Sequence, residues 1–282
     1  MKFLLLRCCL SLYLLGWVQA CLWDSDTLAA EAQGREGEVR TLVGWFDRNP
    51  PRYYEMRLSR VEKELAEAPE SFNLYDDAAV ACDRLGRSDE AIEWIERKRE
   101  AIESSGVPVS DEVRYRSAAN LGTFYAHRWV MQPRDERNAD LSDLEKACEQ
   151  ISLALEINPE AHFGREEVQL LFLQWLLNQE APSISHHAIL SPEGLIGLVR
   201  LGAAWESQDV FRAIQSSAGR QRDGNLAEIA KLRLAELEVE QGGVSSLHPT
   251  FEKDGENARL LGVAGGWILR PSAERIVGEW YQ

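Results

Sequence analysis

Residues 72–102, FNLYDDAAVACDRLGRSDEAIEWIERKREAI, are the stretch that decides the fold. Small and apolar side chains recur there at the three- and four-residue spacing of one helix face, at Tyr75, Ala78, Ala79 and Cys82. The pair Leu85-Gly86 is expected to end this helix, because glycine adopts a left-handed turn at little cost. Ser88 can then cap a second helix, whose first turn is acidic. The stretch therefore predicts two helices joined by a glycine turn.

This stretch resembles a tetratricopeptide repeat (TPR), with Gly86 and Ala91 in the expected positions of the turn and second helix. A second match pairs Asn120–His127, which resembles a first helix, with Ala147–Gly164, which resembles a second helix and its exit. The exit contains Asn158-Pro159, and proline cannot continue a helix. The resemblance implies an all-α fold, a TPR-like α-solenoid of helical hairpins with about four to six helical pairs.

The two matches depart from the repeat pattern in two places. Lys98 stands where the first repeat should have its second small residue. In the second repeat, Tyr125 and Ala147 lie thirteen residues farther apart than the matching pair of the first repeat. The extra residues, near 129–140, are charged and contain proline, which predicts a surface loop or an extension of one helix.

The chain is expected to divide into five segments: a signal peptide at 1–20, N-terminal capping helices at 21–70, TPR-like repeats at 71–180, a linker and short helix at 181–206, and a degenerate repeat with capping helices at 207–282.

Three further helical segments flank the two matches. Asp26–Phe46 and Pro51–Ala68 are predicted to form an N-terminal pair, because repeat units need neighbours to bury their faces. Arg165–Gln179 is a strongly apolar helix that would stack on the second repeat. In the degenerate repeat, Gly219 and Gly224 are expected to bracket the turn.

The first twenty residues have the pattern of a signal peptide. Lys2 and Arg7 supply positive charge, Cys8–Val18 is apolar, and Val18-Gln19-Ala20 fits a cleavage site. Eleven apolar-leaning residues are too few for a mature spanning helix, which needs about 20. No later segment is long and apolar enough, so the sequence predicts export without a membrane span.

Cys21 follows the predicted cleavage site, and two interpretations of it stay open. Val18–Cys21 resembles a bacterial lipobox, which would make Cys21 a lipidation site and the protein an outer-membrane-anchored lipoprotein. Ordinary cleavage after Ala20 would instead release the protein into the periplasm. The other mature cysteines, Cys82 and Cys148, are expected to be buried thiols on helix faces.

The charge and the motifs limit the functions that we expect. The chain has 46 Asp and Glu against 31 Lys and Arg, a net charge of −15, and nucleic-acid binding needs the opposite sign. The sequence contains no nucleophile elbow, phosphate-binding glycine loop, HExxH motif or zinc-ligand spacing. We therefore expect no nucleic-acid partner, no enzyme activity, no cofactor and no metal site.

The TPR resemblance implies a binding surface on the concave face formed by the first helices. It places seven residues there, called the groove residues below: Asn73, Asp76, Asp83, Arg84, Arg116, Thr123 and His127. Family members that grip a C-terminal carboxylate have a lysine where Asp76 stands, so that ligand is not expected. The expected partner is another protein or peptide of basic or mixed charge.

Two functions follow as hypotheses. The first is a protein-interaction scaffold of the bacterial cell envelope that docks a peptide or helix in its concave groove. The second is a structural or assembly subunit that oligomerises through apolar helix faces, with Arg165–Gln179 as the main candidate.

Overall fold

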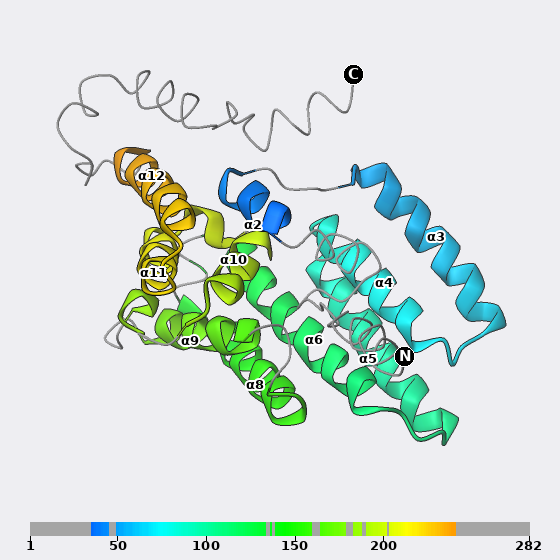
Figure 1. Cartoon of the computed structure of the whole chain (residues 1–282). Helices are drawn as coiled ribbons and strands as arrows, with labels where there is room; N and C mark the ends of the chain where they lie inside the picture. Colours follow the sequence, from blue (N-terminus) through cyan, green and yellow to red (C-terminus); the bar gives the residue numbers. More distant parts are fainter. Residues whose placement is uncertain are drawn as a thin grey trace, which may run out of the picture.

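The computed structural model describes residues 35–44, 49–133, 136, 139–159, 164–178, 183–187, 190–201 and 203–240. Over these ranges the regular elements are helices and there is no strand (Figure 1). The α-helices are α2 (Arg35–Leu42), α3 (Pro51–Glu67), α4 (Phe72–Arg84), α5 (Ser88–Ser105), α6 (Asp111–Met131), α8 (Ser142–Ile157), α9 (Arg165–Leu177), α10 (Pro192–Leu201), α11 (Gln208–Arg220) and α12 (Gly224–Glu240). Two 3-10 helices, η2 (Ile184–His186) and η3 (Ala203–Glu206), flank α10.

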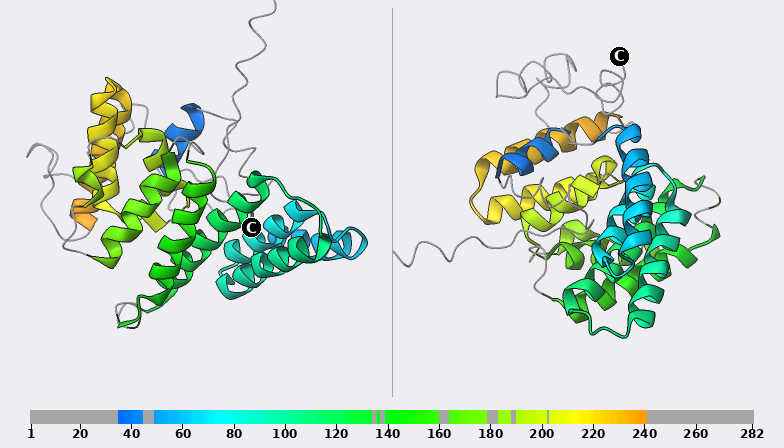
Figure 2. Two further views of the ribbon diagram at one scale, coloured as in Figure 1. Left: turned by 90° about the horizontal axis from the view of Figure 1, so that it is seen from below. Right: turned by 90° about the vertical axis from the view of Figure 1, so that its right-hand side faces the viewer.

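Each helix from α3 to α12 packs against the next one along the chain. In addition α4 contacts α6, so the first helices of two successive hairpins lie against one another. The left view of Figure 2 shows the helices from α3 to α12 following one another across the molecule. The structure is therefore the predicted all-α solenoid of helical hairpins.

The hairpin α4–α5 forms where the sequence predicts it. Gly86 adopts a φ of +73°, the left-handed conformation that glycine reaches at little cost. The predicted apolar face of α4 is buried, at Tyr75, Ala78, Ala79 and Cys82. Ser88 does not cap α5 but is its first residue, and Arg87 takes the capping position.

The hairpin α6–α8 depends on a close approach at Gly122. A Cβ atom on this residue would lie 2.8 Å from two side-chain atoms of Ile151, too near for real carbon atoms. The start of the predicted insertion extends α6, which continues to Met131. The rest of the insertion lies partly outside the described residues.

Helix α10 lies inside the segment 181–206, for which the sequence predicts a linker and a short helix, and it is among the most deeply buried of the described helices. Every residue from Gly194 to Val199 is buried. A Cβ atom on Gly197 would lie 2.1 Å from Nε of Arg165, so this glycine lets the Arg165 side chain cross α10.

Helix α2 differs most from expectation. We expected it to pair with α3, but it packs against α10 and α12, and Figure 1 shows it beside them with α3 at the other side of the molecule. Nε of Arg200 on α10 donates to Oγ1 of Thr41 at 3.3 Å. Among the described residues of this segment, α2 and α3 therefore do not form one hairpin.

Candidate functional site

The groove residues lie on two neighbouring helices, α4 and α6. Asn73, Asp76, Asp83 and Arg84 belong to α4, whereas Arg116, Thr123 and His127 belong to α6. Three hydrogen-bonded pairs connect the two helices, and they join residues 43 or 44 positions apart: Asn73 with Arg116, Asp76 with Asn120, and Asp83 with His127. We call this line of pairs the α4–α6 seam.

The centre of the seam is a buried ion pair. Nζ of Lys98, on α5, donates to the two carboxylate oxygens of Asp76 at 2.9 and 2.8 Å and to the carbonyl oxygen of Val113 at 3.3 Å. Nδ2 of Asn120 donates to the same carboxylate at 3.1 Å. Burial raises the pKa of Asp76 and lowers the pKa of Lys98, because desolvation penalises each charged form. Asp76 is therefore held inside the fold.

The two ends of the seam are closer to solvent. At one end Nη1 of Arg116 donates to Oδ1 of Asn73 at 3.2 Å, and its Nε donates to Glu112 at 2.9 Å. Asn73 is exposed there. At the other end Nδ1 of His127 lies 2.9 Å from both carboxylate oxygens of Asp83. The Asp83 side chain is almost fully buried, whereas His127 and Arg84 stay partly accessible.

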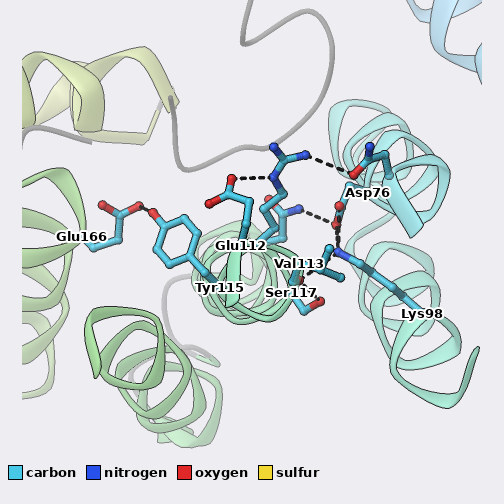
Figure 3. A network of polar contacts seen from close by, with 10 residues as sticks. Asp76, Lys98, Glu112, Val113, Tyr115, Ser117 and Glu166 are labelled. Carbon is cyan, nitrogen blue, oxygen red and sulfur yellow. Dashed lines mark hydrogen bonds and ion pairs between the residues drawn. The ribbon is translucent and has the colours of Figure 1, made fainter. Parts of the chain in front are cut away.

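Helix α6 makes polar contacts on its other side too. The Tyr115 hydroxyl donates to the Glu166 carboxylate on α9, and Figure 3 shows this contact opposite the Asp76–Lys98 pair across α6. Nε2 of Gln169 donates to Oγ1 of Thr123 at 3.1 Å. Thr123 is fully buried, so it binds α9 in the folded chain.

The structure thus separates the groove residues into two groups. Asp76, Asp83 and Thr123 are buried or nearly so and hold helices together. Asn73, Arg84, Arg116 and His127 are partly or fully accessible at the two ends of the seam. Their role in binding stays a prediction.

Sequence reasoning missed the partners that occupy the seam. Lys98 stood out as a departure from the TPR pattern, and a cation in a small-residue position was a signal that an acid had to lie nearby. Asn120 and Gln169 gave no such signal, because polar residues on a helix are ordinary surface residues by default.

Two kinds of group in the described part of the chain bear on chemistry, potential metal ligands and thiols. It contains no group of three or more His, Cys, Asp or Glu side chains able to hold a metal ion. Cys82 is buried and Cys148 half-buried, and both are free thiols. Burial raises the pKa of Cys82 to about 12 and that of Cys148 to about 11, which disfavours the reactive thiolate. Cys21, the lipidation candidate, lies outside the described residues.

Comparison of the chain with protein-family models, with curated proteins and with solved structures finds no match. The TPR resemblance therefore remains a prediction from the sequence. Among the described residues, no helix combines the length and apolar character that crossing a bilayer requires.

Proposed function

We propose that the protein is an exported, non-enzymatic scaffold of the bacterial cell envelope that binds another protein along the α4–α6 seam. The observation that carries this proposal is the placement of the accessible groove residues. Asn73 and Arg84 are eleven residues apart on α4, as are Arg116 and His127 on α6. Eleven residues make just over three turns, so each pair lies on one face of its helix.

The spacing and charge of these residues indicate the size and chemistry of the partner. Eleven residues at the helical rise separate the two ends of the seam by about 16 Å, the length of about five extended residues or three helical turns. Asp76 and Asp83 already have cationic or histidine partners within the fold. The accessible side chains at the two ends, Asn73, Arg84, Arg116 and His127, include no acid, so they favour a peptide of mixed charge over a strongly basic one.

The test is photo-crosslinking with an encoded photoreactive residue in the full-length chain, expressed in cells that contain the partner. Variants carry the residue at Asn73 or Arg84, and a matched variant carries it at Gln221, which is exposed in the α11–α12 turn. We expect the same adduct at Asn73 and Arg84 and none at Gln221. If no adduct forms at Asn73 or Arg84, or if the same adduct forms equally at all three positions, binding along the α4–α6 seam is rejected. Replacement of Asp76 or Asp83 is unsuitable, because both help to hold the fold.

Export and the N-terminus need a separate measurement. Intact mass of the mature protein distinguishes a lipid-modified Cys21 from a free N-terminus after Ala20. A mass that retains residues 1–20 would contradict the proposed export.

One observation favours assembly as a second candidate function. Helix α9 carries six large apolar side chains that are only half-buried: Leu170, Leu171, Phe172, Trp175, Leu176 and Leu177. These residues are spread around the whole helix and most of them pack in part against the core, so the proposal is that their remaining accessible area adds to an apolar contact with another chain. Light scattering at increasing concentration should show an oligomer that Trp175→Glu weakens and that the exposed control Gln174→Glu leaves intact. A strict monomer would exclude this function.

A further inference from the structure

Helix α9 has one side that faces solvent and is partly apolar. Glu167, Gln174 and Asn178 are exposed, and the second and third follow the first by seven and eleven residues, which places all three on one side of the helix. Three leucines share this side at three- or four-residue spacing and are only half-buried: Leu170, Leu171 and Leu177. Each packs in part against the core, and no described element covers the rest of its surface. We call this the solvent side of α9.

The sequence contains an apolar segment beyond the described residues, at 257–270, NARLLGVAGGWILR. Between Arg259 and Arg270 this segment has ten residues and no charged side chain. The hydrophobic effect favours placing such a run against an apolar surface. The segment is cationic at both ends of the run, whereas Glu167 gives the solvent side of α9 an exposed carboxylate. The segment and the surface are therefore complementary in polarity and in charge.

The segment can reach α9 from the end of α12. Residues 241–256 connect α12 to the segment, and sixteen residues span at most about 50 Å when fully extended. Helix α12 packs on α11, and α11 shares the neighbours α10 and η2 with α9. Figure 1 shows α12, α11 and α9 in this order down one side of the molecule. Three packing steps of about 8–10 Å each come to about 30 Å, so the connection is long enough.

We propose that the segment 257–270 docks on the solvent side of α9 within the same chain. The apolar run covers the area that the three leucines leave open, and Arg259 or Arg270 pairs with the carboxylate of Glu167. A segment tethered to its site has an effective concentration on the order of millimolar, which a free partner or a second copy does not reach in dilute solution. This inference goes beyond the binding proposed for the α4–α6 seam, and it gives α9 an occupant other than the second chain of the assembly candidate.

The test is photo-crosslinking in the full-length chain, with an encoded photoreactive residue at the exposed position Gln174. Isotopically light and heavy chains are mixed in equal amounts at low concentration, irradiated and digested, and the linked peptides are identified by mass spectrometry. We expect adducts between position 174 and residues 257–270 in which both peptides are light or both are heavy. A matched control carries the photoreactive residue at Glu62, which is exposed on α3 at the other side of the molecule, and should not give this adduct.

Two substitutions outside the described helices test the apolar run itself. Trp267→Asp should lower the yield of the adduct at least about tenfold, because docking would bury an unpaired charge. Val244→Asp adds the same charge outside the segment and should leave the yield unchanged. Equal yields in these two variants overturn the proposal, as does the absence of any adduct between position 174 and residues 257–270. Adducts that join a light to a heavy peptide also overturn it, in favour of assembly through α9.

Discussion

Lys98 on α5 places its ammonium nitrogen 2.8 Å from the nearer carboxylate oxygen of Asp76 on α4, and the two side chains are only 0% and 2% exposed. With Asn120 on α6, this pair joins three helices at one buried point. Replacement of Lys98 by methionine leaves the carboxylate of Asp76 without its cation. We expect Lys98→Met to lower the free energy of unfolding by about 3–5 kcal/mol, measured by urea denaturation.

The double variant Asp76→Leu with Lys98→Met is the control for this prediction. It removes both charges and fills the volume with apolar side chains, so most of the lost stability should return. A loss below about 1 kcal/mol in Lys98→Met would be typical of an exposed pair and would contradict the burial of this one.

A pH dependence follows from the same carboxyl group. In Lys98→Met, burial without the cation holds the pKa of Asp76 above its unfolded value of about 3.9. Between these two pKa values the folded state binds more protons, so the stability of the variant falls as the pH rises through this window. The free energy of unfolding that Lys98→Met loses relative to the unmodified chain should therefore be smaller at pH 4 than at pH 7. Urea titrations at both pH values measure this difference.

The double variant lacks the Asp76 carboxyl group and should not show this pH dependence. An equal deficit for Lys98→Met at pH 4 and pH 7 would mean that the carboxylate charge is not what destabilises it.

The close crossing of α6 and α8 leaves no room for a side chain at Gly122. A methyl group there would meet Ile151 at 2.8 Å and the carbonyl oxygen of Ala147 at 3.1 Å. We expect Gly122→Ala to lower the free energy of unfolding by about 1–3 kcal/mol through overpacking. Adding Ile151→Val, which removes one of the two clashing atoms, should recover part of the loss.

Gly219 offers a matched control within helix α11. A Cβ atom on Gly219 would meet nothing within 4 Å. Alanine has the higher helix propensity, so Gly219→Ala should stabilise the protein by about 0.5–1 kcal/mol. The two substitutions should thus have opposite signs in the same denaturation assay, and a shared sign would disprove the steric explanation.

The sequence predicted the parts of the fold that have local signals. The α4–α5 hairpin has an apolar period and a glycine turn, and Gly122 lies in the stretch Asn120–His127 that resembles the first helix of a TPR. The docking of α2 had no local signal, because its partners lie on α10 and α12. In the α11–α12 turn the left-handed residue is Arg222, with a φ of 61°, instead of a glycine. A left-handed conformation costs a residue with a side chain about 1–2 kcal/mol, and tertiary packing can outweigh that amount.

The groove residues show the same limit at the candidate site. The repeat pattern placed residues on the face between first helices, but pattern alone does not tell which of them the neighbouring helix covers. Asp76 is buried because Lys98 lies on α5 and Asn120 on α6, 22 and 44 residues away. Such distant pairs are visible only when the helices are placed in space.

The two thiols are expected to differ in reactivity within the folded protein. The pKa of Cys148 is about 11, so roughly one thiol in a thousand is ionised at pH 8, and the pKa of Cys82 is still higher. Alkylation by iodoacetamide at pH 8 should therefore be on the order of a hundredfold slower in the folded chain than in urea, where thiols have a pKa of about 8.5.

Peptide mapping should find Cys148 modified before Cys82, which is fully buried and needs local opening. The Cys148 rate should rise about tenfold per pH unit as the thiolate fraction grows. Equal rates at the two positions in the folded chain would contradict the burial of Cys82 between α4 and α5.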